Sequence, residues 1–203
     1  MSVISQLQSV WNSLDFSYLL GILAAVLPSL LCITVHELCH GLAALALGDD
    51  TARRCGRLSL NPLKHLDPMG LLMMICFHVG WAKPVPVNMA RFKNPKAGMA
   101  LTALAGPVSN LLLSMLLLFC FGLLYFPLSA GSVGQYVLEM LTLGAYISVG
   151  LAVFNLLPVP PLDGSRLLFA CLRDEHYAFV MRYERFFGLA MLLLVFLGIL
   201  DGP

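Results

Sequence analysis

The chain has 203 residues, of which 59% are apolar and 11% charged, and its formal net charge at neutral pH is +1. This composition is too apolar for an ordinary soluble domain and gives no reason to expect a nucleic-acid partner. We expect an all-α polytopic membrane protein in contact with the lipid bilayer, folded as a single membrane-embedded domain over residues 1–203.

The first predicted helix runs from about Phe16 to Leu47, with a bend at Pro28, and Gly48 begins the turn that ends it. Residues 16–35 carry no charge. A transmembrane helix needs about 20 apolar residues, so this stretch is long enough to cross a bilayer.

Near the end of that helix stands the sequence His36-Glu37-Leu38-Cys39-His40. Side chains four positions apart share one helix face, so His36 and His40 can present ring nitrogens to one ion while Glu37 reaches the same region. A chance match is the simple alternative, but ionisable residues in a membrane helix cost roughly 2–3 kcal/mol each and indicate a function. The pattern predicts a metal site with Cys39 packed beside it.

Residues 68–82 form an apolar stretch of only 15 residues, flanked by Lys64 and Lys83. We expect a re-entrant or β-hairpin segment near residues 68–88 that dips into the membrane without crossing it. The valines and prolines of 84–87 favour extended backbone, so Pro84 and Val85 are predicted to lie on an edge strand that pairs with a substrate peptide. A plain interfacial loop is the alternative.

Three further apolar stretches, at about residues 97–126, 133–157 and 186–200, bring the prediction to about four transmembrane helices. Gly98, Ala103, Ala105 and Gly106 near the start of the second span permit close helix approach. The third span breaks at a run of prolines and is followed by Asp163.

All twelve Lys and Arg residues fall within two blocks, 53–96 and 166–185. The positive-inside rule places both blocks in the cytoplasm and both chain termini on the other side of the membrane. The first and third spans then both run inward, so His40 and Asp163 should lie at similar depth near the cytoplasmic side. A catalytic zinc commonly has three protein ligands, and Asp163 is the best candidate for the third.

Other polar residues are weaker candidates. His65, Asp67 and His78 lie in or next to the re-entrant region, and His176 belongs to a charged stretch that we expect to be solvated. Asn110 and Asn155 stand in otherwise apolar spans, where each can donate a hydrogen bond to an oxyanion or to a neighbouring helix.

These motifs together resemble the site-2 proteases, zinc metalloproteases that cut within membranes. His36-Glu37-Leu38-Cys39-His40 is similar to the family's His-Glu-x-x-His motif, and residues 155–164 resemble its Asn-x-x-Pro-x-Pro-Pro-Leu-Asp-Gly motif. Segments 60–68, 80–88 and 105–110 also resemble family segments, so the likeness covers about residues 20–170. It is closest to the compact prokaryotic branch, and no PDZ or CBS domain is expected.

The resemblance implies one zinc ion per chain, held by His36, His40 and Asp163, with Glu37 as the catalytic acid and base and Asn155 near the substrate carbonyl. Transmembrane proteins or peptides are the implied substrates. The implied location is a prokaryotic cell (inner) membrane, with the active site toward the cytoplasm. A homo-oligomer is compatible with the sequence but not indicated by it.

Two other function classes stay open at this point. A metal transporter accounts for His36, His40 and Asp163 but gives Glu37 no role, and an inactive scaffold would be expected to lack a ligand or the base. Iron or cobalt can replace zinc in such a site in vitro. No residue indicates the physiological substrate or the cleavage position.

Overall fold

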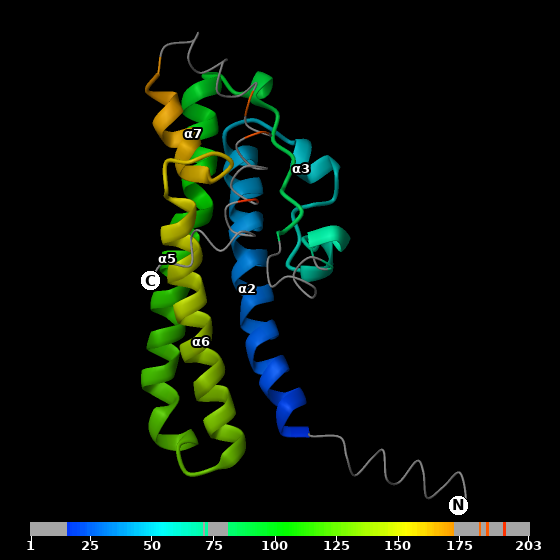
Figure 1. Ribbon diagram of the computed structural model, residues 1–203. Helices are drawn as coiled ribbons and strands as arrows, with labels where there is room; N and C mark the ends of the chain where they lie inside the picture. Colours follow the sequence, from blue (N-terminus) through cyan, green and yellow to red (C-terminus); the bar gives the residue numbers. More distant parts are fainter. Residues whose placement is uncertain are drawn as a thin grey trace, which may run out of the picture.

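The computed structural model describes residues 16–70, 72, 81–172, 183, 186 and 193. Within these residues the elements follow in the order α2 (Phe16–Ala46), α3 (Thr51–Arg54), η1 (Pro62–Lys64), η2 (Met89–Arg91), α5 (Pro95–Leu128), α6 (Ser132–Asn155) and α7 (Asp163–Ala170). The long helices α2, α5 and α6 lie side by side, and α3 and α7 lie at the end away from the α5–α6 turn (Figure 1).

In the part of the chain that the structure describes, three helices are long and apolar enough to cross a membrane: residues Val26–Ala46 of α2, all of α5 and all of α6. The predicted all-α class is therefore confirmed by the described residues, and helices long enough to cross a membrane stand at three of the four predicted spans. The predicted fourth crossing, residues 186–200, lies outside the described residues apart from positions 186 and 193.

Small buried residues let the long helices approach one another. On α6 the buried positions include Gly144, Ala145, Ser148 and Ala152. A Cβ atom added at Gly144 would stand 3.1 Å from Leu117 of α5 and 3.2 Å from Pro28 of α2, so this glycine sits where all three helices meet.

Asparagine side chains cap the start of three elements. Asn94 accepts a hydrogen bond from the N–H of Ala97 at the start of α5, and Asn61 and Asn88 do the same for η1 and η2. Such caps satisfy N–H groups that have no partner within the helix. Both Asn61 and Asn94 precede a proline, whose fixed φ suits the first helical position.

The segment that leads to η2 carries no strand in its described part, so the predicted hairpin near residues 68–88 is not confirmed. Leu66 and Ala82 form an isolated antiparallel bridge, and the N–H of Lys83 donates to the carbonyl of His65 at 2.9 Å. Pro84 and Pro86 have no N–H to extend such a ladder. Residues 71 and 73–80, in the middle of the predicted re-entrant stretch, lie outside the described residues.

A buried carboxylate ties the η2 region to the end of α2. The side chain of Asp49 is fully buried and accepts hydrogen bonds from the N–H and hydroxyl of Thr51 and, at 2.6 Å, from the N–H of Asn88. Burial alone would raise the pKa of Asp49, but these hydrogen bonds and the charge of Arg91 lower it below the usual value. Asp49 thus anchors the segment that approaches the candidate site.

Candidate metal centre

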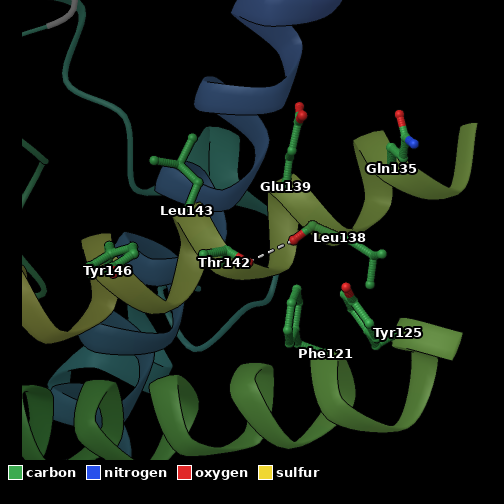
Figure 2. A pocket seen from close by; sticks show the side chains of 8 residues that line it. All are labelled: Phe121, Tyr125, Gln135, Leu138, Glu139, Thr142, Leu143 and Tyr146. Carbon is green, nitrogen blue, oxygen red and sulfur yellow. Dashed lines mark hydrogen bonds between the residues drawn. The ribbon is translucent and has the colours of Figure 1, made fainter. Parts of the chain in front are cut away.

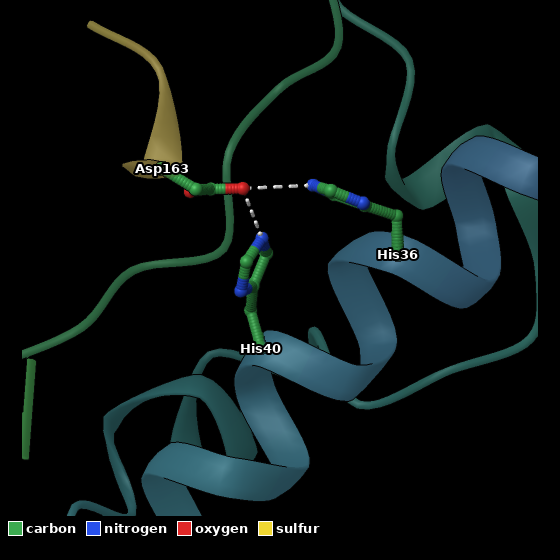
Figure 3. A group of neighbouring side chains, drawn as sticks. All are labelled: His36, His40 and Asp163. Atoms are coloured by element: carbon green, nitrogen blue, oxygen red, sulfur yellow. Dashed lines mark hydrogen bonds and ion pairs between the residues drawn. The ribbon is translucent and has the colours of Figure 1, made fainter. Parts of the chain in front are cut away.

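The residues of the His36–His40 motif occupy the last third of α2, roughly 9–15 Å before its end at Ala46. His36 and His40 are 5% and 8% exposed. Both rings direct Nε2 toward one oxygen of Asp163, the first residue of α7, and each Nε2 lies 3.1 Å from Asp163 Oδ2 (Figure 3). The two helices therefore bring together all three predicted ligands.

The donor set and its spacing fit a zinc ion. One ligand atom from each of His36, His40 and Asp163 lies within 4.8 Å of the others. Ligand atoms about 2.1 Å from a tetrahedral zinc stand about 3.4 Å apart, close to the two 3.1 Å separations seen here. Imidazole nitrogen and carboxylate oxygen are both ordinary zinc ligands.

Asp163 is held in its ionised form. Burial opposes its ionisation, but hydrogen bonds from His36 and His40 and the charges of the two rings lower the pKa of Asp163 to about 2.

Helix α5 packs directly against the two histidine rings. The Nδ1 of His40 lies 2.7 Å from the backbone carbonyl of Thr102, which can only accept, so Nδ1–H donates and Nε2 is the nitrogen left for a metal ion. Gly106 lies one turn further along, where any Cβ atom would collide with both histidine rings. The predicted close approach of this part of the chain is thus an approach to the candidate metal ligands themselves.

Glu37 lies beside the two histidines, and its carboxylate is positioned by the main chain of the 81–88 segment. The N–H of Val85 donates to Glu37 Oε2 at 2.9 Å. The backbone of this segment is held in turn by Arg57, whose guanidinium donates to the carbonyl of Lys83 at 2.6 Å. A carboxylate at the metal site therefore has one of its oxygens fixed by a backbone N–H.

Two adjoining cavities open onto these residues. One has a volume of about 550 Å³ and is lined by all three candidate ligands, by Glu37, by Pro84 and Val85 and by Arg166 of α7. The other, about 480 Å³, is lined mainly by apolar residues of α2 and α6. His36, Glu37, Trp81, Ala82 and Asn155 line both, so the candidate site has a more polar and a more apolar side.

The two candidate oxyanion donors occupy different places. Asn155, the last residue of α6, lines both cavities, and one N–H of its carboxamide donates to the carbonyl of Leu151 at 2.9 Å. Asn110 lines neither cavity. Its carboxamide lies against the Nδ1 of His36, which agrees with the alternative of hydrogen bonding between helices.

Two of the weaker candidates, His65 and Asp67, bond elsewhere and do not line the site. His65 is buried and bonds to the carbonyl of Ser59, and Asp67 accepts from the N–H of Gly70, a local capping contact. His78 and His176 lie outside the described residues. Sequence reasoning missed Thr102, Trp81 and Arg166. The contribution of Thr102 comes from its backbone carbonyl, which has no sequence signal, while an arginine three residues after Asp163 could have been noticed.

A further cavity of about 430 Å³ lies at the opposite end of the bundle, near the α5–α6 turn (Figure 2). It is lined by Phe121, Tyr125, Gln135, Leu138, Glu139, Thr142, Leu143 and Tyr146. It contains one carboxylate and no histidine or cysteine, so it offers no comparable ligand set. Among the described residues, the group of side chains that could hold a metal ion is the one at the α2–α7 contact.

Comparison with known proteins relates the chain to a peptidase family and to proteins named as zinc metalloproteases. The model of Peptidase family M50 matches residues 128–197, which include Asn155 and Asp163. YwhC, named as a candidate zinc metalloprotease of Bacillus subtilis, is 42% identical over 147 residues, covering 70% of this chain and 66% of that protein. Rip2, named as a candidate zinc metalloprotease of Mycobacterium tuberculosis, is 32% identical over 173 residues, covering 83% of this chain and 64% of that protein.

A shorter match joins the chain to the zinc metalloprotease RasP of Bacillus licheniformis, which is 38% identical over 86 residues, or 34% of this chain and 20% of that protein. The chain spans slightly less than two thirds of the length of YwhC and of Rip2. No solved structure matches the chain significantly.

Proposed function

The chain belongs to peptidase family M50, the site-2 proteases, and we propose that it is an intramembrane zinc metalloendopeptidase. Its substrates are proposed to be membrane proteins, cut in or near their transmembrane segments. The observation that carries the proposal is the convergence of His36, His40 and Asp163 within 4.8 Å, with Glu37 beside them on the same cavity.

In this proposal His36, His40 and Asp163 hold one zinc ion per chain. Zinc, when bound in such a site, lowers the pKa of a coordinated water toward about 7 and polarises a carbonyl oxygen. Glu37 takes the proton from the attacking water and delivers it to the leaving amine. Its Oε2 is held by Val85, so the proton passes through Oε1, for which the described residues provide no hydrogen-bond partner.

We assign Asn155 to the substrate carbonyl. Its carboxamide has two N–H groups, of which one bonds to Leu151 and the second is available to an oxyanion at the cavity. Pro84 and Val85 line the same cavity, and we propose that an unwound substrate lies extended along them. The carbonyls of the prolines can accept hydrogen bonds from such a peptide, although the prolines themselves cannot donate.

The arrangement of charge supports an active site near the cytoplasmic face of a prokaryotic cell membrane. The described Lys and Arg residues belong to α3, η1, η2, α7, the start of α5 and the loops between them, which lie at the end of the bundle opposite the α5–α6 turn (Figure 1). Under the positive-inside rule that end faces the cytoplasm, and both termini are proposed to lie on the other side.

The test compares detergent-purified wild-type protein with Glu37→Gln in the cleavage of a panel of labelled transmembrane peptides, with zinc content measured for each. Glu139→Gln is the control, because Glu139 is an exposed carboxylate on α6 away from the site. We expect zinc near one per chain in all three proteins and a cleavage rate about 10²–10⁴-fold lower in Glu37→Gln alone. Bound zinc with no cleavage by the wild type would contradict the proposal and favour transport or scaffolding.

A further inference from the structure

Asn110 is fully buried in the middle of α5, between α6 and α2, the helix that carries His36 and His40. Its Nδ2 lies 3.3 Å from His36 Nδ1, and its backbone carbonyl accepts a hydrogen bond from Ser148 of α6 at 2.8 Å. Its Oδ1 is buried and has no hydrogen-bond partner among the described residues. A buried carboxamide with an unpaired oxygen beside a candidate metal ligand calls for an explanation.

The ring of His40 shows which hydrogen-bond partner the Nδ1 of His36 needs if both rings ligate one metal ion. His40 donates its Nδ1 proton to the carbonyl of Thr102, which leaves Nε2, 3.1 Å from Asp163 Oδ2, as the nitrogen that can ligate a metal ion. His36 presents Nε2 to the same oxygen of Asp163 at the same 3.1 Å distance. A neutral histidine that ligates through Nε2 carries its proton on Nδ1, so its partner there has to be an acceptor.

We propose that Asn110 is a positioning residue for His36: its carboxamide oxygen accepts the Nδ1 proton and so fixes the tautomer and orientation of the ring for zinc. A half-turn of the carboxamide exchanges Oδ1 and Nδ2 without changing the shape of the side chain. One amide atom has no partner in either orientation, so the hydrogen bond to the ring decides between them. This inference rests on the proposed function, because only a metal-binding His36 requires the Nδ1–H tautomer.

Under this assignment helix α5 supplies the outer partner of each histidine, a main-chain carbonyl for His40 and a side-chain amide for His36. Such partners hold the ring and raise the basicity of the ligating nitrogen, and removing one typically weakens metal binding about 10–100-fold. The Thr102 carbonyl cannot be removed by substitution, whereas Asn110 can be changed without touching the ligands.

Two substitutions at position 110 test whether the side chain has to accept a hydrogen bond from the ring of His36 or donate one to it. Asn110→Leu has a similar volume and no polar atom, and Asn110→Asp keeps an oxygen acceptor but has no N–H donor. Ser114→Ala is the matched control, because Ser114 is also buried on α5 and its hydroxyl donates to the carbonyl of Leu111 within its own helix. The zinc dissociation constant is measured by competition with a chromogenic chelator, together with the visible spectrum of the cobalt-substituted protein and a thermal unfolding curve.

The expected result is zinc binding about 10–100-fold weaker in Asn110→Leu, with an altered cobalt spectrum, and binding close to wild type in Asn110→Asp and Ser114→Ala. Unchanged zinc affinity in a folded Asn110→Leu would overturn the inference, and so would a loss in Asn110→Asp equal to that in Asn110→Leu. If Asn110→Leu does not fold, the zinc affinity of Asn110→Asp alone tests the inference: binding close to wild type supports it, and a large loss overturns it. A wild type that binds no zinc would instead overturn the proposed function.

Discussion

The backbone N–H of Val85 and the carboxylate of Glu37 form a 2.9 Å hydrogen bond that joins the 81–88 segment, the last part of the predicted re-entrant or β-hairpin segment, to the helix that carries the candidate ligands. The contact spans 48 positions of sequence. It fixes one carboxylate oxygen and therefore the direction in which the other oxygen faces the cavity. The orientation of the proposed base thus depends on a loop that itself lines the site.

Removing that N–H should impair the proposed base without removing the metal. Val85→Pro lacks the donor, and we expect kcat about tenfold lower with zinc content unchanged, because mispositioning weakens proton transfer. Val85→Ala is the control, since it keeps the N–H while trimming the side chain. Steady-state peptide cleavage and zinc analysis check this prediction, and equal kcat values for the two variants would contradict it.

Asp49 should stabilise the same loop in a pH-dependent way. Its pKa is lowered in the folded protein, so its contribution is fully present above the unfolded value, about 3.9, and is lost as the pH falls through the folded value. We expect Asp49→Asn to cost about 1–3 kcal/mol at pH 7, because a buried acceptor of several hydrogen bonds is weakened. Thermal unfolding of both proteins from pH 7 down to pH 3 should show the difference shrinking at the acid end.

The control for that measurement is Asp50→Asn. The side chain of Asp50 is partly exposed, where it pairs with Arg54 and Arg91. Exposed ion pairs contribute little, about 0–1 kcal/mol. A loss of stability in Asp50→Asn as large as that in Asp49→Asn would show that surface charge, and not the buried anchor, holds the loop.

The main helices and the convergence of the three candidate ligands were predictable because their signals are local or repeated. The second and third spans were predicted at residues 97–126 and 133–157, and the structure has Pro95–Leu128 and Ser132–Asn155. Helical spacing alone places His36 and His40 on one face, and charge asymmetry places Asp163 at the same depth. The short elements η1 and α7 were missed, although Asn61 before a proline is a local start signal.

The partners of the ligands were not predictable in the same way. Whether Asn110 faces a cavity or the ring of His36 depends on the rotation of α5 about its axis, which an almost wholly apolar helix does not reveal. The Thr102 carbonyl acts through the backbone, so the identity of its side chain carries no information. The bond between Val85 and Glu37 joins distant segments and needs the tertiary fold.

Removal of the metal should abolish peptide cleavage. The thiol of Cys39, within the His36–His40 motif, should not be needed for cleavage. Cys39 is only partly buried and does not belong to the group of residues that converge on Asp163. We expect a zinc chelator to remove all activity and added zinc to restore it, in both the wild type and Cys39→Ala. Zinc content near zero in purified Cys39→Ala would contradict this and make the thiol a ligand.

Adding a single methyl group at Gly106 should weaken metal binding, although glycine-to-alanine changes generally stabilise a helix. A Cβ atom there would collide with Nε2 of His40 and stand only 2.7 Å from Cε1 of His36, so Gly106→Ala has to displace both rings. Gly122, on the same helix, has nothing within 4 Å of an added Cβ, and Gly122→Ala is the matched control. Alanine is a better helix former than glycine by about 0.5–1 kcal/mol, so the control should be at least as stable as the wild type.

We expect Gly106→Ala to lose at least about tenfold in zinc affinity, judging from the cost of disturbing ligand orientation, while Gly122→Ala binds normally. Chelator competition measures both, and normal zinc binding by Gly106→Ala would mean that the rings do not need the space that glycine leaves against α5.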